Sequence, residues 1–222
     1  MTETEWLTPG DLRNHVERMW SEKRTRKLRL FSVACCRQLE PWIDEPILLE
    51  GIARGEKFAD GELSDSTMSK WRQKINHLER ERCAGRGTTW TPQMAVYHAV
   101  STVCLESHYG GYTDLWRTLV YHNKVYGKDF VRRGPGLAHV LLHDIFGNPF
   151  RPVAFDPVWR TDTASSLAKH MYESRDFSAM PILADALQDA GCENDDILSH
   201  CRDEKQVHVR GCWVVDLVLG KA

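Results

Sequence analysis

The chain has 222 residues, which is enough for one good-sized hydrophobic core or for two small domains that share an interface. Hydrophobic residues make up 42% of the sequence and charged residues 27%, as in an ordinary soluble globular protein. The formal net charge of -2 argues against a protein that binds nucleic acid regardless of sequence, because such proteins carry a large positive excess.

The sequence shows no membrane span and no signal peptide, and we therefore expect a cytoplasmic protein. No apolar run approaches the length that spans a bilayer, and the opening residues MTETEWLTPGDL are too acidic and polar for a signal peptide. The seven cysteines are therefore expected to be thiols. Cys35 and Cys36 point about 100° apart on a predicted helix, so we interpret them as buried packing residues rather than joint metal ligands.

Apolar residues recur at helical spacing along most of the chain, which predicts an all-α fold with little or no β-sheet. We expect nine to eleven short helices in two lobes, joined by a variable bridging region. The Gly85–Gly87 stretch and Gly134-Pro135-Gly136 are the predicted breaks. The N-terminal lobe would cover residues 1–84, the bridging region 85–133 and the C-terminal lobe 134–222.

The stretch from Leu141 to Arg160 is predicted to join the last lobe to the helix before it. Its prolines restrict the backbone to extended conformations, and its aromatic side chains are expected to pack to either side. Further along, residues 207–219 mix β-branched residues with helical spacing, and we favour a helix because no strand partner is predicted elsewhere.

Two groups of residues are candidate metal ligands. His139 and His143 are four apart and so share one face of a predicted helix, with Asp144 available to orient His143 or contribute an oxygen. Val140 stands where zinc proteases carry their catalytic glutamate, which argues against a metalloprotease.

The second group consists of five residues near the C-terminus, and successive members are eight, one, seven and four residues apart. Within this group His208 and Cys212 have the spacing of a helical pair, so both structural zinc and buried thiols remain open interpretations. The members of this group are Cys192, His200, Cys201, His208 and Cys212.

Five cations crowd the start of the second predicted helix, where the helix dipole is already partly positive. An acidic group is therefore expected nearby, and a solvated face paired with acids is one interpretation. The alternative is a patch for an anion, a protein partner or a nucleic-acid backbone, assisted by Arg132 and Arg133. The five residues are Lys23, Arg24, Arg26, Lys27 and Arg29.

Several blocks of the sequence resemble a large paralogous family of uncharacterised planctomycete proteins. They include RKLRLFSVACCRQL, LLHDIFGNPFRPVAFDPVWRT and HVRGCWVVDLVLGK, and they cover about half the chain. PILADALQDAGC is also similar to a short helical repeat-companion segment of multidomain proteins in those bacteria. The resemblance implies no catalytic residue, and relatives typically have Arg where His143 stands, which argues against a His139–His143 metal pair.

The sequence contains no nucleophile–base constellation, cofactor loop or pair of acids at catalytic spacing. We therefore expect a non-enzymatic protein-interaction or regulatory module with a protein partner and no catalytic cofactor. A metal-binding protein or metalloenzyme, built on either group of candidate ligands, is the alternative. A nucleic-acid contact through the basic residues is the second alternative.

Overall fold

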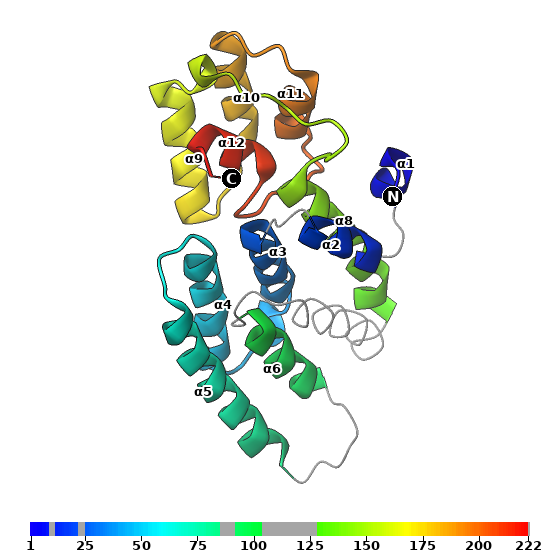
Figure 1. The fold of residues 1–222 in the computed structure, drawn as a ribbon, viewed down its shortest axis with the longest axis vertical. Coiled ribbons are helices and arrows are strands. Elements are labelled where there is room, and N and C mark those ends of the chain that lie inside the picture. The colour runs from blue at the N-terminus through cyan, green and yellow to red at the C-terminus, as the bar shows by residue number, and fades with distance from the viewer. Residues whose placement is uncertain (9–11, 22–24, 85–91, 104–127, 222) are drawn as a thin grey trace. The chain divides into compact units, whose positions relative to one another are not determined.

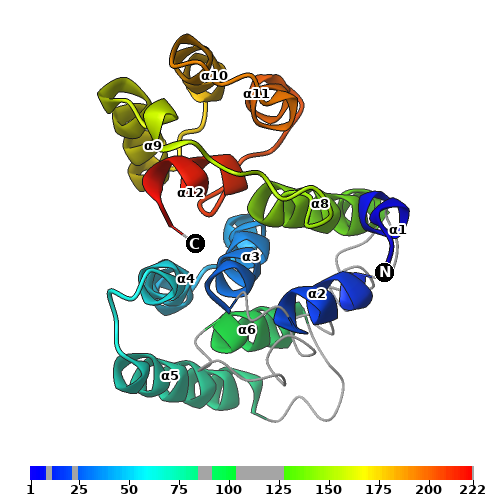
Figure 2. The same cartoon turned by 45° about the horizontal axis from the view of Figure 1, so that its top comes forward.

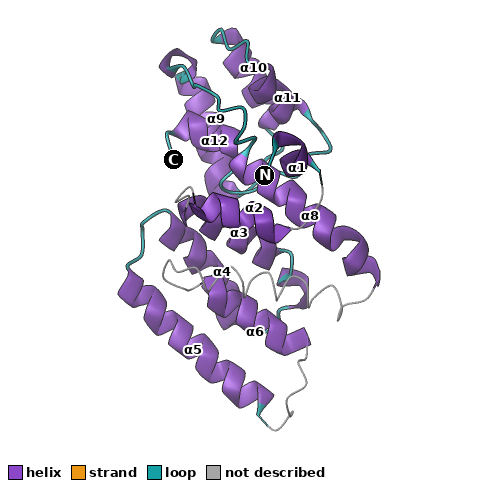
Figure 3. Cartoon of the chain, turned by 45° about the vertical axis from the view of Figure 1, so that its right-hand side comes forward, coloured by secondary structure: helices purple, strands orange, loops and turns teal. Residues whose placement is uncertain are grey.

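A computed structural model describes residues 1–8, 12–21, 25–84, 92–103 and 128–221. Every regular element in these ranges is a helix and no strand occurs among them, which confirms the predicted all-α fold (Figure 3). None of the helices in the described ranges is both long and apolar enough to cross a membrane. The chain forms two compact units, which we call the N-terminal unit (Met1–His139) and the C-terminal unit (Val140–Ala222).

The N-terminal unit begins with a short helix that the sequence analysis did not anticipate. Thr2 caps it, because its hydroxyl accepts a hydrogen bond from the Glu5 amide and its own amide donates to the Glu5 carboxylate. The α-helices that lie wholly within this unit, among the described residues, are α1 (Glu3–Leu7), α2 (Leu12–Ser21), α3 (Thr25–Arg37), α4 (Pro46–Ala59), α5 (Asp65–Cys83) and α6 (Pro92–Val103) (Figure 1).

Helix α4 packs against α3, α5 and α6 (Figure 2). Two glycines on α4 let these helices approach closely. A methyl group added at Gly55 would lie 2.2 Å from Cγ1 of Val103 on α6, and one at Gly51 would lie 2.9 Å from Cγ1 of Val100. Glycine is therefore required at Gly55 by packing rather than by backbone conformation.

A buried ion pair joins α3 to α4 in the same unit. Glu56 is only 1% exposed, and its carboxylate accepts a hydrogen bond of 2.7 Å from Nε of Arg37. Arg37 also contacts Glu40 at 2.6 Å. Because burial of a carboxylate is unfavourable unless it is paired, the ion pair with Arg37 helps to keep Glu56 in the core.

Helix α8 (Lys128–Phe146) continues through Gly134-Pro135-Gly136, so the predicted break at these residues is wrong. A proline removes one helical hydrogen bond but need not end a helix whose other residues favour it. The boundary between the two units falls inside this helix, at Val140, whereas the sequence placed the start of the C-terminal lobe at residue 134.

The C-terminal unit consists of the end of α8 and four further helices around an apolar core. Helix α12 packs against α9 and α11, and α10 packs against α9 and α11 (Figure 2). The helix predicted over residues 207–219 is confirmed only from Trp213, because residues 207–212 are irregular. The four helices are α9 (Asp162–Ser174), α10 (Met180–Asp189), α11 (Asp195–Arg202) and α12 (Trp213–Leu219).

The segment between α8 and α9 is held by local capping and by its last arginine. Asp156 caps a short 3-10 helix (η2, Pro157–Trp159) by accepting a hydrogen bond of 3.0 Å from the Val158 amide. The Arg160 guanidinium donates to the carbonyls of Val218 and Leu217 at 2.7 and 3.0 Å, which caps the end of α12. Phe146 is buried, whereas Phe150, Phe155 and Trp159 are half-buried.

Candidate metal centre

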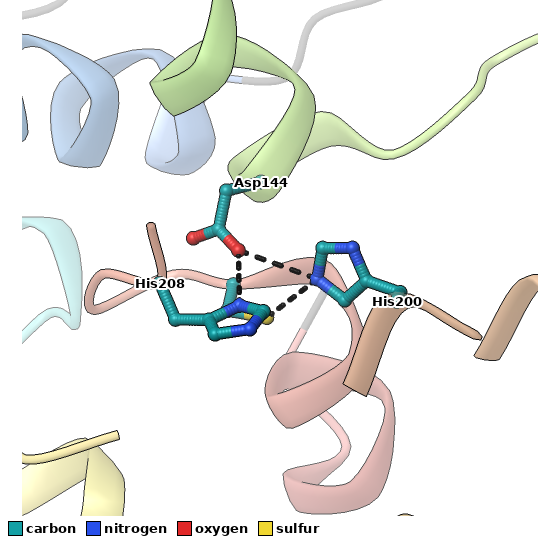
Figure 4. Close-up of side chains that lie close together, drawn as sticks. Asp144, His200 and His208 are labelled. Atoms are coloured by element: carbon teal, nitrogen blue, oxygen red, sulfur yellow. Dashed lines mark hydrogen bonds and ion pairs between the residues drawn. The ribbon is translucent and has the colours of Figure 1, made fainter. Parts of the chain in front are cut away.

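Four side chains of the C-terminal unit converge on one point. Each offers one potential ligand atom, and the four atoms all lie within 4.8 Å of one another. Figure 4 shows the carboxylate and the two imidazoles facing a common centre. We call the group the Asp-His-His-Cys cluster; it consists of Asp144, His200, His208 and Cys212.

The cluster is assembled from three separate segments. Asp144 lies in the last turn of α8, His200 lies in α11, and His208 and Cys212 lie in the segment that leads into α12. Asn194 caps α11, since its side-chain oxygen accepts a hydrogen bond of 3.0 Å from the Ile197 amide.

Two interactions hold the segment before α12 in place. The amide of Cys212 donates to the Val209 carbonyl at 2.9 Å, a turn in which Gly211 adopts φ +99°. The Arg210 guanidinium lies over the ring of Tyr172 on α9, 4.4 Å from its centroid. The positions of His208 and Cys212 are therefore set by the fold of the unit around them.

Four of the six separations between the ligand atoms fall on either side of those around a tetrahedral ion. Nδ1 of His208 and Nε2 of His200 lie 2.8 and 3.3 Å from Oδ1 of Asp144. Sγ of Cys212 lies 3.3 Å from Nε2 of His200 and 3.9 Å from Nδ1 of His208. Zinc ligands at tetrahedral angles stand about 3.3–3.6 Å apart. The observed distances bracket this range.

Asp144 is a carboxylate in a position that calls for a nearby cation. It is fully buried and lies in the last turn of a helix, where the dipole disfavours negative charge. Burial alone raises the pKa of Asp144, but hydrogen bonds from His200 and His208, and their electrostatic interaction with the carboxylate, outweigh burial and hold the pKa below its usual value. The Val209 amide donates to Oδ2 at 2.8 Å, which leaves Oδ1 facing the cluster.

Cys212 is fully buried and its thiol resists ionisation. Burial raises the pKa of Cys212 well above its usual value, and the charge of Asp144 raises it further, although the amides of Val215 and Val214 act in the opposite direction. A cation beside Sγ would reverse this balance, because metal coordination stabilises the thiolate directly.

The arrangement differs from a catalytic cysteine triad. In such a triad one ring nitrogen of the histidine faces the thiol and the other faces the carboxylate. Here Nε2 of His200 faces both Cys212 and Asp144, and Nδ1 of His208 does the same. Neither imidazole lies between the thiol and the carboxylate. One atom from each side chain converges instead, an arrangement that could hold a single ion.

The first group of candidate ligands does not come together. His139 belongs to the N-terminal unit, where its ring lies 4.6 Å from that of His15, and it is 4% exposed. His143 is half-buried and is not part of the Asp-His-His-Cys cluster. In the part of the chain that the structure describes, this cluster is the one group with metal-binding geometry.

Three of the five tail candidates, His200, His208 and Cys212, do converge. The other two, Cys192 and Cys201, lie in the apolar core of the C-terminal unit. Burial raises the pKa of Cys201 to about 12, with further contributions from the charges of Asp144 and Cys192.

Asp144 was predicted only as a partner of His143, and its pairing with His200 and His208 was not predicted. One signal for this pairing was present in the sequence. Asp144 lies beside the apolar residues Leu141, Leu142 and Ile145 on α8, which predicts that its carboxylate is buried and needs a partner.

The basic residues at the start of α3 are partly engaged within the protein. The Arg26 guanidinium contacts the buried Asp60 carboxylate at 3.1 Å, which supplies the acidic group expected there. The Arg29 guanidinium lies 3.9 Å from the ring centroid of Phe58. Lys23, Arg24 and the side chains of Arg132 and Arg133 lie outside the described residues.

Comparisons with known proteins add no functional assignment. The sequence matches no family model, and no curated protein and no solved structure is significantly similar to it.

Proposed function

We propose that this protein is a metal-binding helical module in which the Asp-His-His-Cys cluster holds one divalent transition-metal ion, with Zn²⁺ as the preferred ion. The convergence of four different ligand atoms within 4.8 Å, in a buried position, carries the proposal. Two imidazole nitrogens, one thiolate and one carboxylate form a donor set that suits Zn²⁺, whereas Mg²⁺ and Ca²⁺ favour oxygen ligands alone.

The proposed role of the ion is structural. Structural zinc sites have four protein ligands, whereas catalytic sites have three and keep one position open for water or substrate. Asp144 and Cys212 are fully buried, and the side chains of His200 and His208 are 13% and 6% exposed. A closed four-ligand site favours a module that works through its surface over a metalloenzyme.

The ion would tie together parts of the chain that are far apart in sequence. Asp144 lies more than 50 residues before the other three ligands, and the ligands come from α8, α11 and the segment before α12. Because such a site does not exist in the unfolded chain, the free energy of metal binding contributes directly to the stability of the C-terminal unit.

A metal titration of the full chain tests the proposal. Protein stripped with a chelator is titrated with Zn²⁺ against a competing coloured indicator, and one tightly bound equivalent is expected. Asp144→Ala and His208→Ala should each weaken binding by at least tenfold. His170→Ala is the matched control, because His170 is exposed on α9 and remote from the cluster in sequence. Binding below about a tenth of an equivalent by the wild-type chain would refute the proposal.

A partner protein remains part of the proposal, because a structural ion suits an interaction or regulatory module. Affinity capture with the metal-loaded and the metal-stripped chain tests this part separately. A partner retained only by the loaded chain would support it. Identical background from both chains would remove its support.

A further inference from the structure

Gly147, the first residue after α8, lies against the indole of Trp213. A methyl group added at Gly147 would stand 3.1, 3.2 and 3.4 Å from Cγ, Cδ2 and Cδ1 of Trp213. Two of these distances are tighter than most real Cβ contacts. Gly147 also has φ +64°, a backbone conformation that favours glycine. Glycine at this position is thus favoured twice, by its backbone conformation and by its contact with the indole.

The same indole also touches the metal-ligand cluster. Its ring lies 5.2 Å from the ring of His200, at an interplanar angle of 51°. Trp213 directly follows Cys212, and Gly147 follows Asp144 by three residues. The Trp213 side chain therefore contacts the ligand His200 on α11, and Trp213 is the neighbour of the ligand Cys212 in sequence. It also contacts the backbone at Gly147, just beyond the ligand Asp144 on α8.

We propose that Trp213, through its contact with Gly147, is a positioning residue that sets the spacing of the metal ligands; this inference rests on the proposed metal-binding function. Metal–ligand distances must be correct to about 0.2 Å, and the groups that orient the ligands affect affinity nearly as strongly as the ligands do. A rigid ring between the ends of α8 and α11 provides such a spacer. Any displacement of the indole changes the separation of Asp144 from His200 and Cys212.

The matched control for Gly147 is Gly220. Its φ of +65° is almost the same, but a methyl group there would meet only the Arg160 guanidinium at 3.7 Å, an ordinary contact. Gly147→Ala and Gly220→Ala therefore share the backbone penalty and differ in contact with the indole. A larger loss of metal affinity in Gly147→Ala is the effect expected from the contact, and the double variant Gly147→Ala/Trp213→Ala separates that contact from backbone strain beside Asp144.

Titration of the stripped full-length protein with Co²⁺ tests the inference, because the visible absorption of Co²⁺ reports both affinity and tetrahedral geometry. Gly147→Ala is expected to weaken Co²⁺ binding by about 10–100-fold and to alter the spectrum. Gly220→Ala is expected to stay within about twofold of the wild type. Trp213→Phe, a milder change that keeps a ring, should fall between them.

Trp213→Ala and the double variant Gly147→Ala/Trp213→Ala complete a cycle. If Gly147 acts through the indole, adding Gly147→Ala to Trp213→Ala should weaken binding little further. Equal effects of the two glycine variants, or unchanged affinity and spectrum in Trp213→Phe and Trp213→Ala, would overturn the positioning role while leaving the metal site intact. Absence of Co²⁺ binding by the wild type would overturn both proposals.

Discussion

Metal removal is expected to destabilise the C-terminal unit selectively. At free Zn²⁺ about 100 times the dissociation constant, binding to the native state stabilises it by about 2.7 kcal/mol. In a domain of this size each 1 kcal/mol shifts Tm by about 4–8 °C, so chelation should lower Tm by about 11–22 °C. The N-terminal unit contains none of the four ligands and should respond much less.

The native state is the preferred binder because of how the ligands are distributed. In the unfolded chain, bringing Asp144 to His200 closes a loop of about 55 residues, which costs about 3.5 kcal/mol in chain entropy. The tail residues His200, His208 and Cys212 can still bind metal weakly when unfolded, which reduces the net stabilisation. The folded unit has all four ligand atoms in place.

Hydrogen exchange followed by mass spectrometry measures this effect helix by helix. Chelation should accelerate exchange in α11, in α12 and at the end of α8, and should leave α3 and α4 unchanged. Cys212→Ala, which keeps three of the four ligands, should respond to chelator much less than the wild type, whereas His170→Ala should respond like the wild type. Equal acceleration in both units, or a full chelator response in Cys212→Ala, would refute the reasoning.

Three further predictions concern the N-terminal unit. Gly55→Ala should destabilise it by about 1–3 kcal/mol in urea unfolding, because the added methyl group would lie 2.2 Å from Val103. Arg37→Ala should cost about 3–5 kcal/mol, because the buried Glu56 carboxylate would lose an ion-pair partner. Burial raises the pKa of the Cys35 thiol, which therefore stays protonated at neutral pH. Alkylation of Cys35 should proceed only as fast as the unit opens, and mass spectrometry of the labelled peptide measures that rate.

The two substitutions have controls within the chain. Gly136→Ala adds a methyl group in open space on α8 and should be neutral or slightly stabilising. Arg54→Ala breaks a more exposed pair with Glu50 and should cost less than about 1 kcal/mol. If Gly55→Ala matched Gly136→Ala, or Arg37→Ala matched Arg54→Ala, the packing or the burial argument would be wrong. Rapid labelling of Cys35 in the folded protein would contradict its burial.

The sequence predicted the helices well because their signals are local. Helical spacing of apolar residues and capping residues such as Ser64 and Thr161 act within a few residues of each element. The two errors, at α1 and at Pro135, arise because only local signals can be recognised in the sequence. The five-residue helix α1 is too short for a periodic pattern, and α8 continues through Pro135 although proline is a local helix breaker.

The candidate site was only half predictable, because its assembly depends on tertiary structure. Three tail ligands were recognised by residue type, but their irregular spacing matches no zinc motif. Asp144 joins them from another segment of the chain, and the conformation of residues 207–212 brings His208 back toward it. No periodic pattern in the sequence predicts the conformation of residues 207–212. A single sequence also does not indicate which residues far apart in the chain are in contact.

X-ray absorption at the zinc edge of the one-equivalent complex gives the decisive test of the metal site, because it counts the ligands by element. The Asp-His-His-Cys cluster predicts one sulfur at about 2.3 Å and three nitrogen or oxygen atoms at about 2.0–2.2 Å, two of them imidazole. Cys212→Ala should remove the sulfur signal. Two or more sulfur ligands would place the ion elsewhere among the tail cysteines, and a shell of six oxygen atoms would contradict a buried site at this cluster.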